Sequence, residues 1–166
     1  MRNWFFLSLL ALLITLACTP AAPEQALVVR AIDGDTIELA TGQRVRYIGI
    51  DTPETYPAVE CYGREAWTKN RELVEGRWVR LEKDVSETDR YGRLLRYVWV
   101  DGVMVNAELV RLGYAPAVSY PPDVKHQELF RQLEGEAKGA GRGLWGVCPA
   151  SSREPALAGS QNGSVK

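Results

Sequence analysis

The chain has 166 residues, 46% apolar and 25% charged, which is enough for one domain to bury a core without several cross-links. Its 20 Lys and Arg nearly balance its 21 Asp and Glu, and the formal net charge of -1 excludes attraction of nucleic acid or an acidic membrane by overall charge. An anionic substrate would have to be bound by a local group of basic side chains.

The first 18 residues have the pattern of an export signal. Arg2 precedes an apolar run, Trp4–Ala17, whose length of about 14 residues is below the roughly 20 needed to cross a bilayer. Cys18 follows in the sequence ITLACTP, which resembles a bacterial lipoprotein cleavage site, so we expect a lipid anchor on Cys18. Cleavage of a plain signal peptide after Ala21 or Ala22 is the alternative. Both interpretations predict an exported protein, either secreted or held at the cell envelope.

Residues 19–25 are small, polar and Pro-rich, which is typical of a linker, so the predicted folded domain spans residues 26–149. Five segments of this domain alternate polar and apolar residues or are rich in β-branched and aromatic ones, and Asp-Gly and Thr-Gly turns separate the first three. The predicted strands are Leu27–Ile32, Thr36–Ala40, Arg44–Ile50, Arg77–Lys83 and Leu94–Val100.

Three helices are predicted, each ending next to a glycine: Gly63–Glu75, Val105–Leu112 and Val124–Lys138. Five strands with a helix after the third predict an α+β fold, a β-barrel with helices of the OB type, in which a five-stranded Greek-key barrel carries three helices. An open mixed sheet is the alternative. Residues 150–166 contain little to bury, and we predict that they are disordered.

The three cysteines predict one disulfide. With Cys18 acylated, Cys61 and Cys148 remain, and an even number of cysteines in an oxidising compartment favours their pairing. Two buried thiols are the alternative that spacing does not exclude.

Acidic residues at two predicted turns suggest a site for a hard cation. Seen alone, Asp33 and Asp35 flank an ordinary Asp-Gly hairpin corner. Asp51, however, ends a neighbouring predicted strand, and a calcium ion takes about six to eight oxygen ligands, including carboxylates and backbone carbonyls such as that of Thr52. Zinc is not favoured, because His126 is the only histidine in the chain and we place it on the surface.

Two arginines and a glutamate would complete a phosphodiesterase site. The guanidinium groups of Arg46 and Arg93 are suited to binding two phosphate oxygens at once, and Glu54 is placed to deprotonate an attacking water. Strict strand alternation puts Arg46 and Asp51 on opposite faces unless the strand bends. A set of solvated surface ion pairs is the alternative.

The order of short motifs between residues 28 and 145 resembles the thermonuclease family, typified by staphylococcal nuclease. These motifs are DGDT, an arginine five residues before DTPE, YGREA, DRYGR, NAELVRLGYA and GRGLW. The resemblance implies an OB-fold enzyme that uses Ca²⁺ to hydrolyse DNA and RNA to 3′-phosphate products. Nothing in the sequence calls for more than a monomer.

The resemblance also implies a role for each matching residue. Asp35, Asp51 and the Thr52 carbonyl would be calcium ligands, Arg46 and Arg93 would stabilise the phosphate, and Glu54 would be the general base. The remaining implied residues either support the site, as Asp33 and Thr36 do, or lie near the nucleotide, as Arg90, Tyr91 and Tyr120 do. Val118 stands where the family often has a second pocket tyrosine, so weaker base stacking is expected.

Three other functions compete with this hypothesis. A non-catalytic nucleic-acid-binding OB module of the cell envelope should lack one of the five charged site residues, and none is missing. A structural envelope lipoprotein is supported only by the leader and the linker. A cysteine nucleophile acting with His126 is the weakest alternative, since a disulfide would block it.

Overall fold

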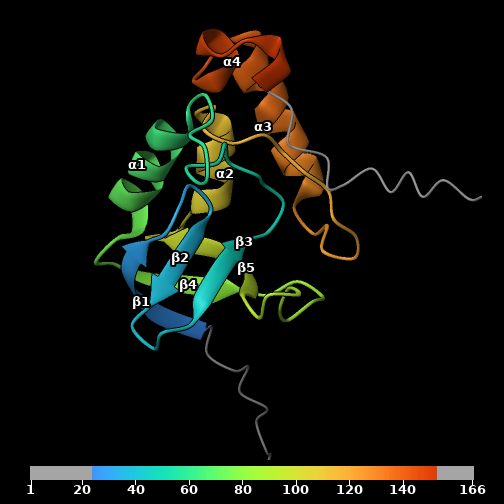
Figure 1. The fold of residues 1–166 in the computed structure, drawn as a ribbon. Coiled ribbons are helices and arrows are strands. Elements are labelled where there is room, and N and C mark those ends of the chain that lie inside the picture. The colour runs from blue at the N-terminus through green and yellow to red at the C-terminus, as the bar shows by residue number, and fades with distance from the viewer. Residues whose placement is uncertain (1–23, 153–166) are drawn as a thin grey trace, which may run out of the picture.

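The structure, a computed structural model, describes residues 24–152 (Figure 1). The expected signal peptide, the lipidation site Cys18, most of the expected linker and residues 153–166 lie outside the described residues. Within residues 24–152, no helix is both long enough and apolar enough to cross a membrane.

Five strands close into a barrel, with helices packed on one end and one side (Figure 1). Neighbouring strands follow the order β3-β2-β1-β4-β5 and pair antiparallel, and a parallel pairing of β3 with β5 closes the barrel. A short sixth strand extends β5 at its outer edge. The strands are β1 (Glu24–Ala31), β2 (Thr36–Leu39), β3 (Arg44–Tyr47), β4 (Trp78–Glu82), β5 (Leu94–Val100) and β6 (Val103–Met104). The predicted OB-type barrel with helices is confirmed.

Alternation of side chains explains why these strands form a closed barrel. In β3, Val45 and Tyr47 are buried, whereas Arg44 is exposed and Arg46 is half-buried. A strand with this pattern buries one face and leaves the other to solvent. β4 shows the same alternation, and the buried residues of β1, β2 and β5 complete a mainly aliphatic core. Arg44 and Arg46 project from the outer face of the barrel.

The three longer helices occur along the chain in the predicted order. α1 lies between β3 and β4 and packs on β1, while α2 packs on β5 and on α3. The helices are α1 (Gly63–Val74), α2 (Val105–Arg111), α3 (Gln127–Gly139) and the four-residue α4 (Leu144–Val147), followed by a 3₁₀ turn over Ala150–Ser152. α4 was not predicted, because four residues are too few to show helical periodicity. β6 was missed for the same reason, since it has only two residues.

The ends of the domain are longer than expected. β1 begins inside the expected linker, because Glu24 and Gln25 pair with Leu81 and Arg80 of β4. The 3₁₀ turn over Ala150–Ser152 extends into the segment that we expected to be disordered.

Two internal boundaries differ from the sequence prediction by more than one residue. β3 ends at Tyr47 rather than Ile50, because Gly49 has a left-handed φ of 80° that ends the extended chain. α3 begins at Gln127 rather than Val124, because backbone hydrogen bonds from the amide of Asp123 to Tyr120 and from Gln127 to Val124 form turns before it.

A disulfide joins the middle of the domain to its end. Cys61, just before α1, bonds to Cys148, just after α4, with an S–S distance of 2.05 Å. This is the pair that the cysteine count predicts. The bond spans 87 residues of sequence and lies beside a small second core formed by Ala137, Leu144 and Trp145.

Candidate active site

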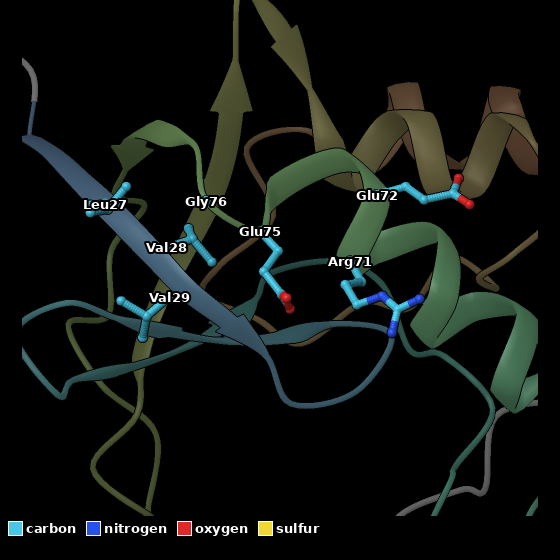
Figure 2. Close-up of a pocket in the computed structure, with 7 residues that line it drawn as sticks. All are labelled: Leu27, Val28, Val29, Arg71, Glu72, Glu75 and Gly76. Carbon is cyan, nitrogen blue, oxygen red and sulfur yellow. The ribbon is translucent and has the colours of Figure 1, made fainter.

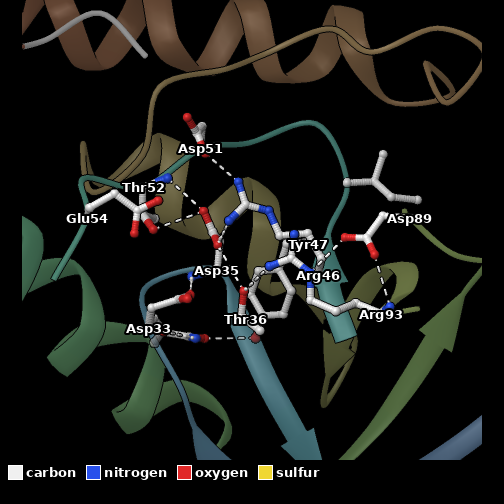
Figure 3. Close-up of polar contacts among 12 residues, drawn as sticks. Asp33, Asp35, Thr36, Arg46, Tyr47, Asp51, Thr52, Glu54, Asp89 and Arg93 are labelled. Atoms are coloured by element: carbon white, nitrogen blue, oxygen red, sulfur yellow. Dashed lines mark hydrogen bonds and ion pairs between the residues drawn. The ribbon is translucent and has the colours of Figure 1, made fainter. Parts of the chain in front are cut away.

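The charged residues singled out in the sequence come from three parts of the barrel and meet at one rim. Figure 3 shows Asp35 just before β2, Arg46 on β3, and the segment after β3 that carries Asp51 and Glu54. Arg93 reaches the same rim from the turn before β5.

Asp35 is the buried centre of this group, with no exposed surface. Its Oδ2 accepts hydrogen bonds from the backbone N–H of Thr52 at 2.7 Å and from the Thr52 hydroxyl at 2.9 Å. Its Oδ1 accepts from Arg46 and, at 3.3 Å, from the Thr36 hydroxyl. Both carboxylate oxygens are therefore fixed by donors from three different segments.

Arg46 bridges two carboxylates. One terminal nitrogen donates to Asp35 and the other donates to Asp51 (Figure 3). Strict alternation along an extended strand would have turned Asp51 away, but the strand ends at Tyr47 and the chain bends at Gly49. That bend has no room for a side chain, because a Cβ on Gly49 would lie 2.4 Å from the Phe130 ring.

A second layer of hydrogen bonds holds the loop between β1 and β2. The Asp33 carboxylate accepts the backbone N–H of Asp35 at 3.0 Å, and the Asp33 carbonyl accepts from the Asn70 side chain at 2.9 Å. Asn70, which is buried on α1, in turn accepts a hydrogen bond from the Tyr47 hydroxyl at 2.8 Å. Helix α1 and strand β3 thus fix the loop that presents Asp35.

Glu54 lies on the solvent side of the same rim. Its backbone is tied to Glu60: the Glu54 N–H donates to the Glu60 carboxylate at 2.9 Å, and the Glu60 N–H donates to the Glu54 carbonyl at 2.9 Å. Partial burial, and next the nearby charge of Asp33, raise the pKa of the Glu54 carboxyl above its ordinary value. A carboxylate with a raised pKa is a better proton acceptor when a water molecule must be activated.

Arg93 is oriented by Asp89. The Arg93 Nε donates to Asp89 Oδ2 at 2.7 Å, and the backbone N–H groups of Arg93 and Tyr91 donate to Asp89 Oδ1 at 3.0 and 2.9 Å. A terminal nitrogen of Arg93 lies 3.5 Å from the Thr36 hydroxyl, which itself contacts Asp35. The guanidinium of Arg93 is therefore held beside the Asp35 and Arg46 pair.

A pocket of about 410 Å³ opens next to the two arginines. Arg46 and Arg93 form part of its wall, and the exposed rings of Tyr91 and Tyr120 stand at its edge. Arg90 also lines it, and its guanidinium carbon lies 4.8 Å from the centre of the Tyr91 ring. An apolar floor, aromatic edges and positive charge form a combination that suits a nucleotide.

The donor set suits a hard cation. Asp35 and Asp51 place two carboxylates around the single guanidinium of Arg46, and carboxylate oxygens are ligands that a hard cation prefers. Burial raises the pKa of Asp35 against the opposing effect of Arg46, so a further positive charge near this carboxylate would favour its ionised form. Among residues 24–152, no three His, Cys, Asp or Glu side chains form a metal-binding group by themselves, so backbone and solvent oxygens would have to complete the shell.

A second pocket, of about 660 Å³, lies between β1 and the end of α1 (Figure 2). Arg71 and Glu75 border it, and the Glu75 carboxylate accepts the backbone N–H of Ala31 at 3.2 Å. None of the residues that we singled out in the sequence lines this pocket, so it is separate from the candidate active site.

Comparison with known proteins shows the family of the chain. Residues 44–147 match the family described as staphylococcal nuclease homologue. The chain belongs to this family.

Two staphylococcal relatives are similar over most of their length. The thermonuclease of Staphylococcus hyicus is 41% identical over 124 residues, which cover 71% of this chain and 73% of that protein. The thermonuclease of Staphylococcus intermedius is 40% identical over 133 residues, which cover 76% and 79% respectively. Endonuclease YncB of Bacillus subtilis is 42% identical over 142 residues, 78% of this chain and 67% of that protein. The chain is accordingly a hydrolase of the phosphodiester nuclease type.

Several residues that hold the nuclease site together were not identified from the sequence. Asp89 orients Arg93, Glu60 holds the Glu54 backbone, and Asn70 supports the Asp33 loop. Thr52, which we considered only for its carbonyl, contributes its N–H and hydroxyl to Asp35. An aspartate one residue before the Arg-Tyr-Gly turn is a local signal that could have identified Asp89, whereas the other contacts depend on the tertiary fold.

His126, which we placed on the surface, is in fact packed against the barrel. Its ring meets that of Tyr97 edge-on, with 4.5 Å between centroids, and its Nε2 lies 3.0 Å from a carboxylate oxygen of Glu82. It does not line the pocket beside Arg46 and Arg93.

Proposed function

We propose that this chain is a calcium-dependent endonuclease that hydrolyses DNA and RNA to products with 3′-phosphates. The observation that supports it best is that Arg46 binds the carboxylates of Asp35 and Asp51 at the barrel rim that also carries Glu54. Arg46 also lines a nucleotide-sized pocket together with Arg93. The thermonucleases and the endonuclease to which the chain is similar support the same conclusion.

Ca²⁺ would be held by Asp35, Asp51 and the carbonyl of Thr52. When bound, the ion would polarise a phosphate oxygen and offset the negative charge that builds up during hydrolysis. Asp33 and Thr36 would keep Asp35 in position through the hydrogen bonds described above.

The side chains of the site would divide the reaction between them. Glu54 would accept a proton from the attacking water as its oxygen bonds to phosphorus. The bond from phosphorus to the 5′-oxygen would break, and that oxygen would leave as a hydroxyl after taking up a proton, so the phosphate would remain on the 3′-oxygen. Arg46 and Arg93 would neutralise the phosphate oxygens, whose charge is greatest in the transition state.

The rim of the pocket would bind the rest of the nucleotide. Tyr91 and Tyr120 offer exposed rings for base stacking, and Arg90 adds a positive charge beside Tyr91. The N-terminal sequence supports export, with a lipid anchor at Cys18 holding a monomeric enzyme at the cell envelope.

A cleavage assay with end-group analysis tests this proposal. The purified domain should cut single-stranded DNA and RNA in calcium, lose this activity in EGTA, and leave 3′-phosphate ends. Full cleavage in EGTA would contradict the metal assignment, and 5′-phosphate ends would contradict the direction of bond breakage. Binding of nucleic acid without cleavage under all conditions would favour a non-catalytic binding module.

A further inference from the structure

A second depression adjoins the nucleotide pocket on the far side of Tyr91. It has a volume of about 540 Å³, and its wall is formed by two facing turns, with Gly42, Gln43 and Arg44 on one and Tyr91, Gly92 and Arg93 on the other. Tyr91 and Arg93 line both depressions. We call this second depression the Arg44 pocket.

Strand register explains why the two depressions are neighbours. β3 and β5 pair in parallel, with Val45 opposite Leu94. Arg44 and Arg93 each come one residue earlier, so they lie at the same level at the start of adjacent strands. Arg44 and Arg46 point to the same outer face of β3, two residues apart, which corresponds to about 7 Å along a strand. The three arginines therefore form a continuous positive edge that runs from one depression to the other.

Arg44 is available to a ligand. It is exposed, and among residues 24–152 it forms no ion pair. Glu38 lies opposite Arg44 on β2, but the Glu38 carboxylate is already paired with Arg30. By contrast, Arg46 and Arg93 are both engaged with aspartates.

The remaining wall of the Arg44 pocket is open and can make polar contacts. A Cβ built on Gly42 or Gly92 would meet no atom within 4 Å, so both turns border free space. The side-chain oxygen Oε1 of Gln43 accepts a hydrogen bond from the Thr41 hydroxyl at 3.2 Å. The backbone N–H of Gln43 donates to the Thr41 hydroxyl, whereas its side-chain Nε2 has no hydrogen bond to any residue that the structure describes and remains a donor.

We propose that the Arg44 pocket is a second subsite for the nucleic-acid strand, in which Arg44 binds the phosphate of a nucleotide next to the one held by Arg46 and Arg93. Tyr91 would then separate two successive nucleotides of a single strand. This inference rests on the proposed nuclease function and identifies its preferred substrate as an oligonucleotide longer than a dinucleotide.

Kinetics on short and long substrates test the subsite. Arg44→Ala should lower kcat/KM on a single-stranded oligonucleotide about fivefold more than on a dinucleotide, the effect of losing one exposed charge pair. Arg44→Lys should recover most of the loss, since the charge is kept. The matched control is Arg131→Ala, which removes an exposed arginine from α3 and changes the net charge equally.

Binding without divalent ions provides an independent measurement. Fluorescence anisotropy of a labelled oligothymidylate, recorded in EDTA over a range of salt concentrations, should give a log–log salt slope for Arg44→Ala that is lower by about 0.7, the value for one phosphate contact on a single strand. Arg131→Ala should leave the slope unchanged.

Two failures are distinguishable. If the unmodified protein cleaves DNA but Arg44→Ala and Arg131→Ala behave alike on both substrates and in the salt titration, the subsite is wrong and the nuclease proposal stands. If the unmodified protein cleaves no substrate in calcium, the nuclease proposal fails, and the salt slope then shows whether Arg44 still contacts the strand.

Discussion

The buried centre and the exposed rim of the candidate active site are built in different ways. At the centre, Asp35 has no exposed surface, and donors from Thr52, Thr36 and Arg46 hold its two carboxylate oxygens. At the rim, the rings of Tyr91 and Tyr120 are 67% and 54% exposed. Charge geometry is therefore fixed where bond breaking is proposed, whereas substrate binding is left to side chains that can adapt.

This difference predicts that substitutions at the centre lower activity and stability far more than substitutions at the rim do. Glu54→Gln, which removes the proposed base without changing side-chain size, should lower kcat by about 10² to 10⁴ while the melting temperature stays the same. Single-turnover cleavage in saturating calcium measures this loss. A variant with unaltered kcat would show that another group activates the water.

Stability should show the same division between centre and rim. Asp35→Ala leaves Arg46 and the Thr52 N–H without their buried acceptor, so in EDTA the free energy of unfolding should fall by about 3–5 kcal/mol. Urea denaturation provides the measurement. Glu128→Ala, which breaks an exposed pair with Arg131, is the control and should cost about 1 kcal/mol or less. Equal losses would mean that the centre is not held as tightly as the hydrogen bonds indicate.

A substitution at the rim should weaken substrate binding and leave the rate of the chemical step nearly unchanged. Tyr120→Ala removes a stacking surface worth about 1–3 kcal/mol per base, so KM for single-stranded DNA should rise about fivefold or more with little change in kcat. Trp78→Ala, at another exposed aromatic residue outside the pocket, should leave both constants unchanged. A fall in kcat with constant KM would place Tyr120 in the reacting centre instead.

Some features of the fold and of the site could be predicted from the sequence, and others could not. Alternation and turn glycines predicted the five barrel strands, because each strand buries one face. The bend at Gly49 that brings Asp51 to Arg46 was not predictable from alternation, since it depends on packing against Phe130. The charged residues that meet at the centre were candidates from their positions at predicted turns and strand ends, and the resemblance to thermonucleases implied a role for each.

Contacts between distant segments account for most of what the sequence did not show. The Thr52 N–H and the Asp35 carboxylate are 17 residues apart, and the Asn70 side chain and the Asp33 carbonyl are 37 apart. No local pattern encodes such a pair, because each depends on how α1 and the strands pack. The Asp89 and Arg93 pair is local, and its turn signal was present in the sequence.

The smallest predicted effect lies outside both regions, between β4 and α3. Burial acts to raise the pKa of Glu82, but hydrogen bonds from Lys125 and His126 outweigh it and lower the pKa from 4.5 to about 2. A depressed pKa stabilises the fold above pH 4.5, and this contribution disappears as the pH falls towards 2. The difference in unfolding free energy between the unmodified protein and Glu82→Gln should be about 1 kcal/mol at pH 6 and shrink over that range. A difference that does not change with pH would contradict the ion pair.

The most direct test of the metal centre is the effect of calcium on the melting temperature of the unmodified protein and of Asp51→Asn. Ion binding to the folded state should raise the melting temperature of the unmodified protein as calcium increases, by mass action. Asp51→Asn, which keeps the side-chain shape but removes one proposed ligand charge, should lose most of this rise. An equal rise in both proteins, or no rise in either, would contradict a calcium site formed by Asp35 and Asp51.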